Sequence, residues 1–287
     1  MSTTAEAMPA GTLVRGPTAL GDDTRRLLRL TWTLAATDFK LRFFGSALGY
    51  LWQLMRPLML FGILFTVFTT LGFTGPERHY GVSLLLGIVL YNFFGEATGG
   101  AVKSILTRES LVRKIDFPRL AVPLSTVLQA LFNLGLNLVP VVVFLIADGG
   151  RPRLSWLAFP LLIVVLATMG LGLAMLLSSL YVRYRDIEPI WDVVLQALFY
   201  ASPILYTVTL IEQKAGASAV KLLLLLNPFA AVVQEGKHLF VDPSHPSVAA
   251  ALGSTMLVLV PLAATGALLV IGYVVFDREA PRIAENL

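Results

Sequence analysis

The sequence predicts an all-α integral membrane protein with six transmembrane helices, an N-terminal amphipathic interfacial helix and re-entrant half-helices on the outer side. Composition is the first reason, because 56% of the 287 residues are apolar and only 14% are charged. A soluble globular domain has about 25% charged residues, so this chain has too few charges to cover a water-facing surface. The excess apolar surface must therefore face lipid.

The position of the basic residues is the second reason. The net charge is +4 and the pI is about 9.4, but Lys and Arg lie in short segments between apolar runs. This distribution favours a membrane protein over a nucleic-acid-binding protein. Most of these residues lie near the two termini and in the connectors 106–116 and 182–189. The positive-inside rule therefore predicts that both termini are cytoplasmic.

The N-terminal region divides into a tail and a helix. Residues 1–22 are polar and predict a flexible cytoplasmic tail, without the apolar segment of a signal peptide. Residues 23–44 place apolar side chains on one helical face and basic side chains on another, which is typical of a helix in the membrane interface. The basic positions are Arg26, Arg29 and Lys40. The alternative is a packed helix of a small soluble domain.

Residues 45–276 form the predicted transmembrane domain, and residues 277–287 form a charged cytoplasmic tail. Each span is long enough to cross the hydrocarbon core at about 1.5 Å per residue. The predicted spans are 47–73, 81–105, 118–147, 154–181, 190–211 and 247–276.

The apolar segment 220–241 predicts two short half-helices that dip into the outer leaflet. The apolar run before Asn227 is too short to cross the membrane, and Pro228 removes a backbone donor. The second half carries Glu235 and Lys237, which are unfavourable in a lipid-exposed span. A true seventh span is the alternative, and it would put the basic C-terminal tail outside.

Motifs for catalysis are missing from the sequence. It has no Cys, three scattered His residues, no nucleophile with a plausible base, no His–carboxylate cluster and no GxxxxGK[ST] loop. We therefore expect no catalytic residue, no metal site and no cofactor bound by this chain. A membrane enzyme acting on lipid-linked sugars is less favoured, because Asp186 and Glu188 are too few acidic residues for it.

The connector 106–116 is the best candidate for contact with a soluble partner. Glu109 precedes Arg113 by four residues, which is a favourable pairing on a helix. Both signs of charge lie around a few apolar side chains. The candidate docking residues in this connector are Arg108, Glu109, Arg113 and Lys114. The alternative is an ordinary solvated loop with positive-inside charges.

Four segments, taken in order, resemble the permease subunit of type 2 ABC exporters. They are GSALGYLWQLMRPL (45–58), ESLVRKIDFPRLAVPLS (109–125), YRDI (184–187) and NPF (227–229). The set is most similar to the branch that exports lipid-linked polysaccharides such as O-antigen or teichoic acid. Each motif is weak alone, but their order and spacing extend over nearly the whole chain.

This resemblance implies a homodimer in the bacterial cytoplasmic (inner) membrane, joined to a separate ATPase subunit that binds ATP and Mg. The ATPase would contact residues 24–44 and 106–117, and the outer half-helices would form a gate at Asn227 and Pro228. The cargo would be an undecaprenyl-linked glycan. The partners are then the ATPase, a second permease copy, membrane lipid and the glycan, with no nucleic acid.

Arg56 and Glu96 are charged residues that lie well inside the predicted spans. Arg56 and Glu96 should sit at similar depth, because their spans run in opposite directions, and a lone charge there is unfavourable. We expect the two to form an ion pair, or Arg56 to meet the lipid diphosphate. The interpretation that Arg56 marks the membrane interface stays open.

Aromatic and amide side chains complete the candidate substrate channel. Aromatic faces with polar edges suit sugar rings, although interfacial belts and helix packing explain single aromatic residues as well. Gln129, Asn133 and Asn137 are spaced by four, so they share one helix face, which we expect to look toward the partner or the channel. The aromatic candidates are Trp52, Tyr91, Tyr200 and Tyr206.

Two other classes of transporter stay open. A type 2 ABC exporter of small molecules, such as drugs or antibiotics, shares the fold and the partner. An ion-coupled secondary transporter would need ionisable residues near the midplane and an internal inverted repeat. The sequence shows no convincing repeat, which disfavours the second class.

Overall fold

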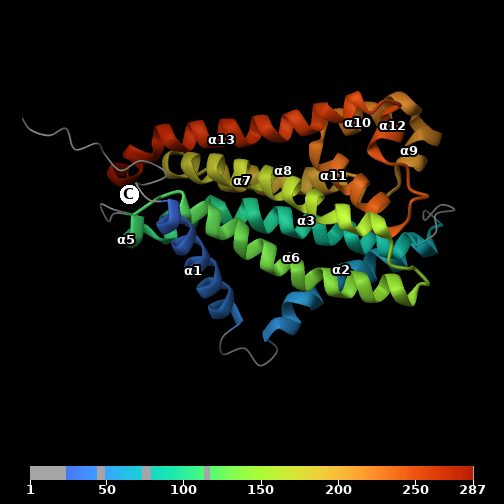
Figure 1. Cartoon of the computed structure of the whole chain (residues 1–287), viewed down its shortest axis with the longest axis horizontal. Coiled ribbons are helices and arrows are strands. Elements are labelled where there is room, and N and C mark those ends of the chain that lie inside the picture. Colours follow the sequence, from blue (N-terminus) through green and yellow to red (C-terminus); the bar gives the residue numbers. More distant parts are fainter. Residues whose placement is uncertain (1–23, 44–48, 73–78, 113–116, 287) are drawn as a thin grey trace, which may run out of the picture.

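The computed structural model describes residues 24–43, 49–72, 79–112 and 117–286, and these form helices joined by turns (Figure 1). The elements are α1 (Thr24–Phe43), α2 (Gly49–Thr70), α3 (Tyr80–Val102), α4 (Ser104–Thr107), α5 (Glu109–Val112), α6 (Ala121–Ala147), η1 (Leu154–Ala158), α7 (Phe159–Arg183), α8 (Ile187–Tyr200), α9 (Val208–Ala215), α10 (Ala217–Leu226), α11 (Pro228–Gly236), η2 (Lys237–Val241), α12 (Val248–Leu252), η3 (Met256–Val258) and α13 (Leu259–Asn286).

The long helices run side by side and define two ends of the bundle (Figure 1). At one end lie α4, α5 and the C-terminal portion of α13, and we name it the α5 end. At the other lie α9, α10 and α12, and we name it the α9 end. Because α3 begins at the α9 end and α6 ends there, the loops at this end bring together residues far apart in the sequence.

Among the described residues, five helical segments are long and apolar enough to cross a membrane, and they match five of the six predicted spans. They are Leu51–Thr70, Tyr80–Val102, Ala121–Ala147, Leu154–Arg183 and Met256–Ala280.

The fifth predicted span, 190–211, differs from the prediction. The helix α8 has 14 residues and ends at Tyr200, which gives a length of about 21 Å at 1.5 Å per residue. The chain then turns and begins α9 at Val208. Pro203 explains the early end, because proline disfavours a helical conformation of the residue before it. Hydropathy alone does not detect this turn, because its residues are also mostly apolar.

The segment predicted as two half-helices forms two helical pieces, Ala217–Leu226 (α10) and Pro228–Val241 (α11 with η2), which meet at an angle of 109°. Asn227 caps α11, because its side-chain Oδ1 accepts a hydrogen bond from the backbone N–H of Ala230 at 3.0 Å. Pro228 occupies the first turn of α11, where a missing N–H is tolerated. The Asn-Pro pair therefore ends one helix and starts the next in a new direction.

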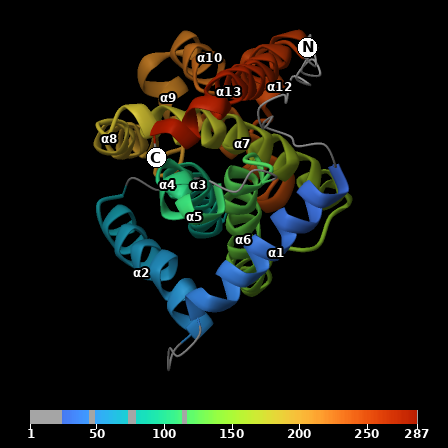
Figure 2. The ribbon, with the colours of Figure 1, turned by 90° about the vertical axis from the view of Figure 1, so that its left-hand side faces the viewer.

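The helix α3 forms the centre of the bundle. In its apolar window 72% of the residues are buried, against 11% for the span in α2. Figure 2 shows α3 enclosed by α6, α7 and α8, with α1 and α2 on the outside. The residue Phe132 of α6 contacts Trp32 and Phe39 of α1, with ring centroids 5.5 Å apart in both pairs. These ring contacts place α1 against the bundle as a separate helix.

The helices α7 and α13 touch through their backbones. A Cβ atom added to Gly272 would lie 2.0 Å from the carbonyl oxygen of Gly172. Only small residues permit such an approach between two apolar helices. This contact fixes α13 on the face of α7 opposite to α6.

Candidate functional site

Glu96 of α3 is the centre of a polar cluster inside the bundle. Its Oε1 accepts a hydrogen bond from Gln53 Nε2 of α2 at 2.8 Å. Its Oε2 accepts one from Asn133 Nδ2 of α6 and lies 3.6 Å from Arg42 Nη1 at the end of α1. Four helices therefore converge on one carboxylate, which remains 26% exposed.

Two cavities adjoin Glu96, one of about 340 Å³ and one of about 190 Å³. The larger cavity extends toward the α5 end, and besides Glu96 it is lined by Arg42, Gly100, Ser104, Thr107, Arg108, Thr126, Gln129 and Ala130. The smaller one is lined by Gln53, Arg56, Pro57, Tyr91, Asn92, Gly95 and Asn137. Since a water molecule takes about 30 Å³, each cavity has room for several waters or a small polar group.

The amide face of α6 points toward these cavities. Asn133 contacts Glu96, while Gln129 and Asn137 line the larger and the smaller cavity respectively. The Oδ1 atoms of Asn133 and Asn137 are buried and have no hydrogen-bond partner within the described part of the chain. Buried polar atoms are seldom left unpaired. These two oxygens are therefore suited to receive donors from water or from a hydroxyl-bearing ligand.

The ion pair expected between Glu96 and Arg56 is not formed in this structure. Arg56 lines the same cavity as Glu96, but among the described residues the charged partner of Glu96 is Arg42. Arg42 lies in the last turn of α1, before the first predicted span. The side chain of Arg56 is exposed and is therefore accessible to another anion.

At the α5 end, Arg108 joins α1 to the rest of the bundle. It forms an ion pair with Asp38 of α1 and donates a hydrogen bond to Ser125 Oγ of α6 at 2.8 Å. Burial lowers the pKa of Arg108 from its ordinary value. Contact of Arg108 with a partner stays a prediction; within the chain, its side chain joins α1 to α6.

The other candidate docking residues fall into two groups. Arg26, Arg29 and Lys40 are exposed on α1, and Glu109 is half-buried in α5. Arg113 and Lys114 lie outside the described residues. Where the structure describes the connector 106–116, the predicted single helix is replaced by the short helices α4 and α5, which meet at Arg108.

The aromatic candidates do not form one group. Tyr91 packs between helices, with its ring centroid 4.8 Å from Phe199 of α8 and 6.4 Å from Phe229 of α11. Trp52 and Tyr200 are 57% and 59% exposed. Tyr206 donates a hydrogen bond from its hydroxyl to the carbonyl of Tyr200 at 3.0 Å. Of the four, Tyr91 alone lines one of the two cavities beside Glu96.

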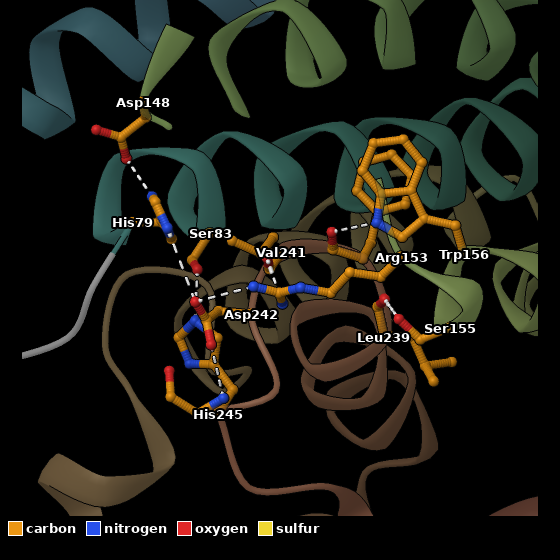
Figure 3. A network of polar contacts seen from close by, with 12 residues as sticks. His79, Ser83, Asp148, Arg153, Ser155, Trp156, Leu239, Val241, Asp242 and His245 are labelled. Atoms are coloured by element: carbon orange, nitrogen blue, oxygen red, sulfur yellow. Dashed lines mark hydrogen bonds and ion pairs between the residues drawn. The ribbon is translucent and has the colours of Figure 1, made fainter. Parts of the chain in front are cut away.

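A second polar network lies at the α9 end (Figure 3). His79 Nδ1 lies 2.6 Å from Asp148 Oδ2, and His79 Nε2 lies 3.7 Å from Asp242 Oδ2. Arg153 also pairs with Asp242, at 3.5 Å. Burial alone would raise the pKa of Asp242, but hydrogen bonds from Ser244 and the nearby Arg153 outweigh it and lower this pKa. These contacts tie the start of α3 to the loops that follow α6 and η2.

The hydroxyl and indole groups of η1 reinforce this network. Ser155 Oγ donates to the carbonyl of Leu239 at 2.7 Å, and Trp156 Nε1 donates to that of Phe240 at 2.9 Å. Both acceptors belong to η2, which is a single turn of π-helix and leaves carbonyl groups for side chains to bind. Ser155 and Trp156 fall in the predicted span 154–181, and nothing in their local pattern indicates a contact with η2.

The comparison with known proteins decides the family. Residues 29–234 match the sequence model of ABC-2 type transporters. The chain belongs to the ABC-2 type transporter family. Together with its long apolar helices, this makes it a multi-pass membrane permease of an ABC transporter. Glu96, both cavities and the amide face of α6 all lie inside the matched ABC-2 region.

Curated relatives of this ABC-2 permease carry a more specific name. It is 28% identical over 217 residues to the O-antigen export system permease protein RfbA of Klebsiella pneumoniae, a match that covers 75% of the chain and 82% of the relative. It is also 28% identical over 217 residues to the RfbA permease of Myxococcus xanthus, covering 75% of the chain and 81% of the relative.

Proposed function

We propose that this permease exports a lipid-linked polysaccharide across the bacterial cytoplasmic membrane. The observation that carries the proposal is its similarity to O-antigen export permeases over most of both chains. The cavities beside Glu96 support it, because their amide and carboxylate groups suit a cargo rich in hydroxyl groups. Arg56, exposed and next to the smaller cavity, is our candidate for contact with the lipid diphosphate.

The driving force comes from a separate ATPase subunit in this proposal, which holds ATP and Mg. The chain has no GxxxxGK[ST] loop of its own. The exposed basic face of α1 and the α4–α5 region would bind this ATPase. The ion pair between Arg108 and Asp38 would link these two regions of the permease. The α5 end is then cytoplasmic, and the bent pair α10–α11 is a re-entrant segment in the outer leaflet.

The permease acts as a homodimer in this proposal. The span in α2 buries only 11% of its residues within one chain. Contact with lipid is enough to explain exposed apolar side chains. Trp52 and Tyr200 are different, because they are exposed and are also candidates for contact with the sugar. In this proposal, a second copy encloses these rings in a shared channel.

Co-purification with the ATPase tests the proposal. Charge reversal at two exposed positions, Arg26→Glu with Arg29→Glu, should lower ATPase recovery at least about fivefold, because complementary charge steers such docking. The same test applies to Arg113 and Lys114. Lys214→Glu on α9 is the matched control, since it reverses an exposed charge at the opposite end. Equal loss in the control, or no loss in the α1 variant, would contradict the docking assignment.

A further inference from the structure

The early end of α8 leaves backbone carbonyl groups without partners inside the helix, and other parts of the chain provide those partners. A helix leaves its last carbonyl groups unpaired, and α8 ends at Tyr200, with Ser202 and Ile204 of the following turn fully buried. In a membrane protein each unpaired backbone group away from water is unfavourable by several kcal/mol. The carbonyls of residues 200–206 therefore need partners from elsewhere in the bundle.

Side chains from three elements supply those partners. Asn227 Nδ2, at the start of α11, lies 3.0 Å from Ser202 Oγ and 3.3 Å from the carbonyl oxygen of Ala201. Tyr80 of α3 donates its hydroxyl to the carbonyl of Leu205 at 2.8 Å. Tyr206 donates its own hydroxyl to the carbonyl of Tyr200. Asn227 and Tyr80, which are distant in sequence, thus hold the 201–206 turn together with its own Tyr206.

Lys237 makes the central contact with this turn. Its Nζ donates to the carbonyl of Pro203 at 2.5 Å and lies 3.4 Å from that of Tyr206. The side chain is 1% exposed, although its position in the sequence placed it among the outer charges. A buried ammonium group is stable where carbonyl dipoles converge, as they do at the C-terminal end of a helix. Lys237 therefore occupies the site that the early end of α8 creates.

We propose that Lys237, with Asn227, positions Tyr200 and Tyr206 for transport by binding polar groups of the 201–206 turn, which the early end of α8 creates. Lys237 begins η2 and Asn227 caps α11, so both ends of α11 are fastened to the 201–206 turn. The two tyrosines consequently have a fixed place beside the 201–206 turn.

This inference rests on the proposed export function, and the experiment separates the two. The chain has no cysteine, so Tyr200→Cys introduces a unique thiol at an exposed position. Its reaction with a membrane-impermeant maleimide reports the placement of the turn. Export is measured as the host's own polysaccharide on the surface of cells whose chromosomal copy of this permease has been deleted.

We expect Lys237→Met to raise the labelling rate of Tyr200→Cys about fivefold and to lower export about tenfold, the factor that corresponds to 1.4 kcal/mol. Lys237→Gln keeps one donor and should give intermediate values, and it replaces the Met variant if that variant does not accumulate. Ser155→Ala is the matched control. It removes a hydrogen bond to η2 and should leave the labelling rate unchanged.

A double-mutant cycle distinguishes positioning from general destabilisation. In the Tyr200→Ala/Tyr206→Ala background, Lys237→Met should lower export no further, because its effect acts through those rings. Three outcomes would overturn the proposal. Lys237→Met could lower export by the same factor in the tyrosine background as in the wild type, Lys237→Met could leave the labelling rate of Tyr200→Cys unchanged, or the Tyr200→Ala/Tyr206→Ala variant could export at the wild-type level. Failure of the export function itself looks different, since cells lacking this chain would then display normal surface polysaccharide.

Discussion

Glu96 and Lys237 both lie inside this apolar bundle, and their surroundings differ in kind. Glu96 has side-chain partners, two adjoining cavities and neighbouring amide oxygens without partners in the described chain. Lys237 is fully buried, and its partners named above are backbone carbonyls. A charge beside open space can exchange its partners for a ligand. A charge enclosed by carbonyls stabilises one conformation of the chain.

The largest expected effect is a loss of stability when Lys237, the charge enclosed by carbonyls, is replaced. Lys237→Met should lower the free energy of unfolding by about 2–3 kcal/mol, because the carbonyls of Pro203 and Tyr206 lose a charged donor. Thermal unfolding of the purified protein in detergent measures this. Lys214→Met, at an exposed position of α9, is the control and should be close to neutral. Equal shifts in both variants would remove the distinction between the two regions.

Glu96, the charge beside the two cavities, should show the reverse pattern, in which export changes more than stability. Glu96→Gln keeps the size of the side chain but removes its attraction for Arg42. Export should fall about tenfold, a loss equivalent to 1.4 kcal/mol, while the Tm of the purified protein should stay close to that of the wild type. The same detergent assay and the surface polysaccharide assay give both values. Wild-type export by this variant would mean that Glu96 has no role in transport.

A neighbouring residue sharpens the same comparison. Asn137→Leu removes a buried oxygen without a described partner, so stability should rise by about 1 kcal/mol while export falls. Asn133→Leu is the contrast, because Asn133 donates to Glu96 and its loss should destabilise the protein. If both variants shift the Tm in the same direction, the prediction that the unpaired oxygen of Asn137 lowers the stability of the folded protein is wrong.

The smallest effect concerns the network at the α9 end. Because the pKa of Asp242 is lowered in the folded state, its carboxylate contributes stability above its ordinary pKa and loses this contribution as the pH falls through the lowered value. The fall in Tm between pH 7 and about pH 3, below the ordinary Asp pKa of about 3.9, should therefore be smaller in Asp242→Asn. Asp186→Asn, exposed near the α5 end, is the control and should keep the wild-type pH dependence.

Several features of the site could be predicted from local sequence. The spacing of Gln129, Asn133 and Asn137 predicts a shared face, because helical geometry depends on separation along the chain alone. The Asn227-Pro228 pair predicts the break between α10 and α11 for the same local reason. Residues that owe their role to contacts between distant helices, such as Gln53 and Phe229, could not be predicted in this way.

The sequence by itself determined which segments are apolar enough to span a membrane, because hydropathy adds up along the chain. Tertiary structure decided which partner each charge takes. Glu96 pairs with Arg42 rather than Arg56 because α1 returns to α3, and Lys237 is buried because α8 ends early beside it. Both outcomes depend on where separate helices end in space, which no local pattern of residues specifies.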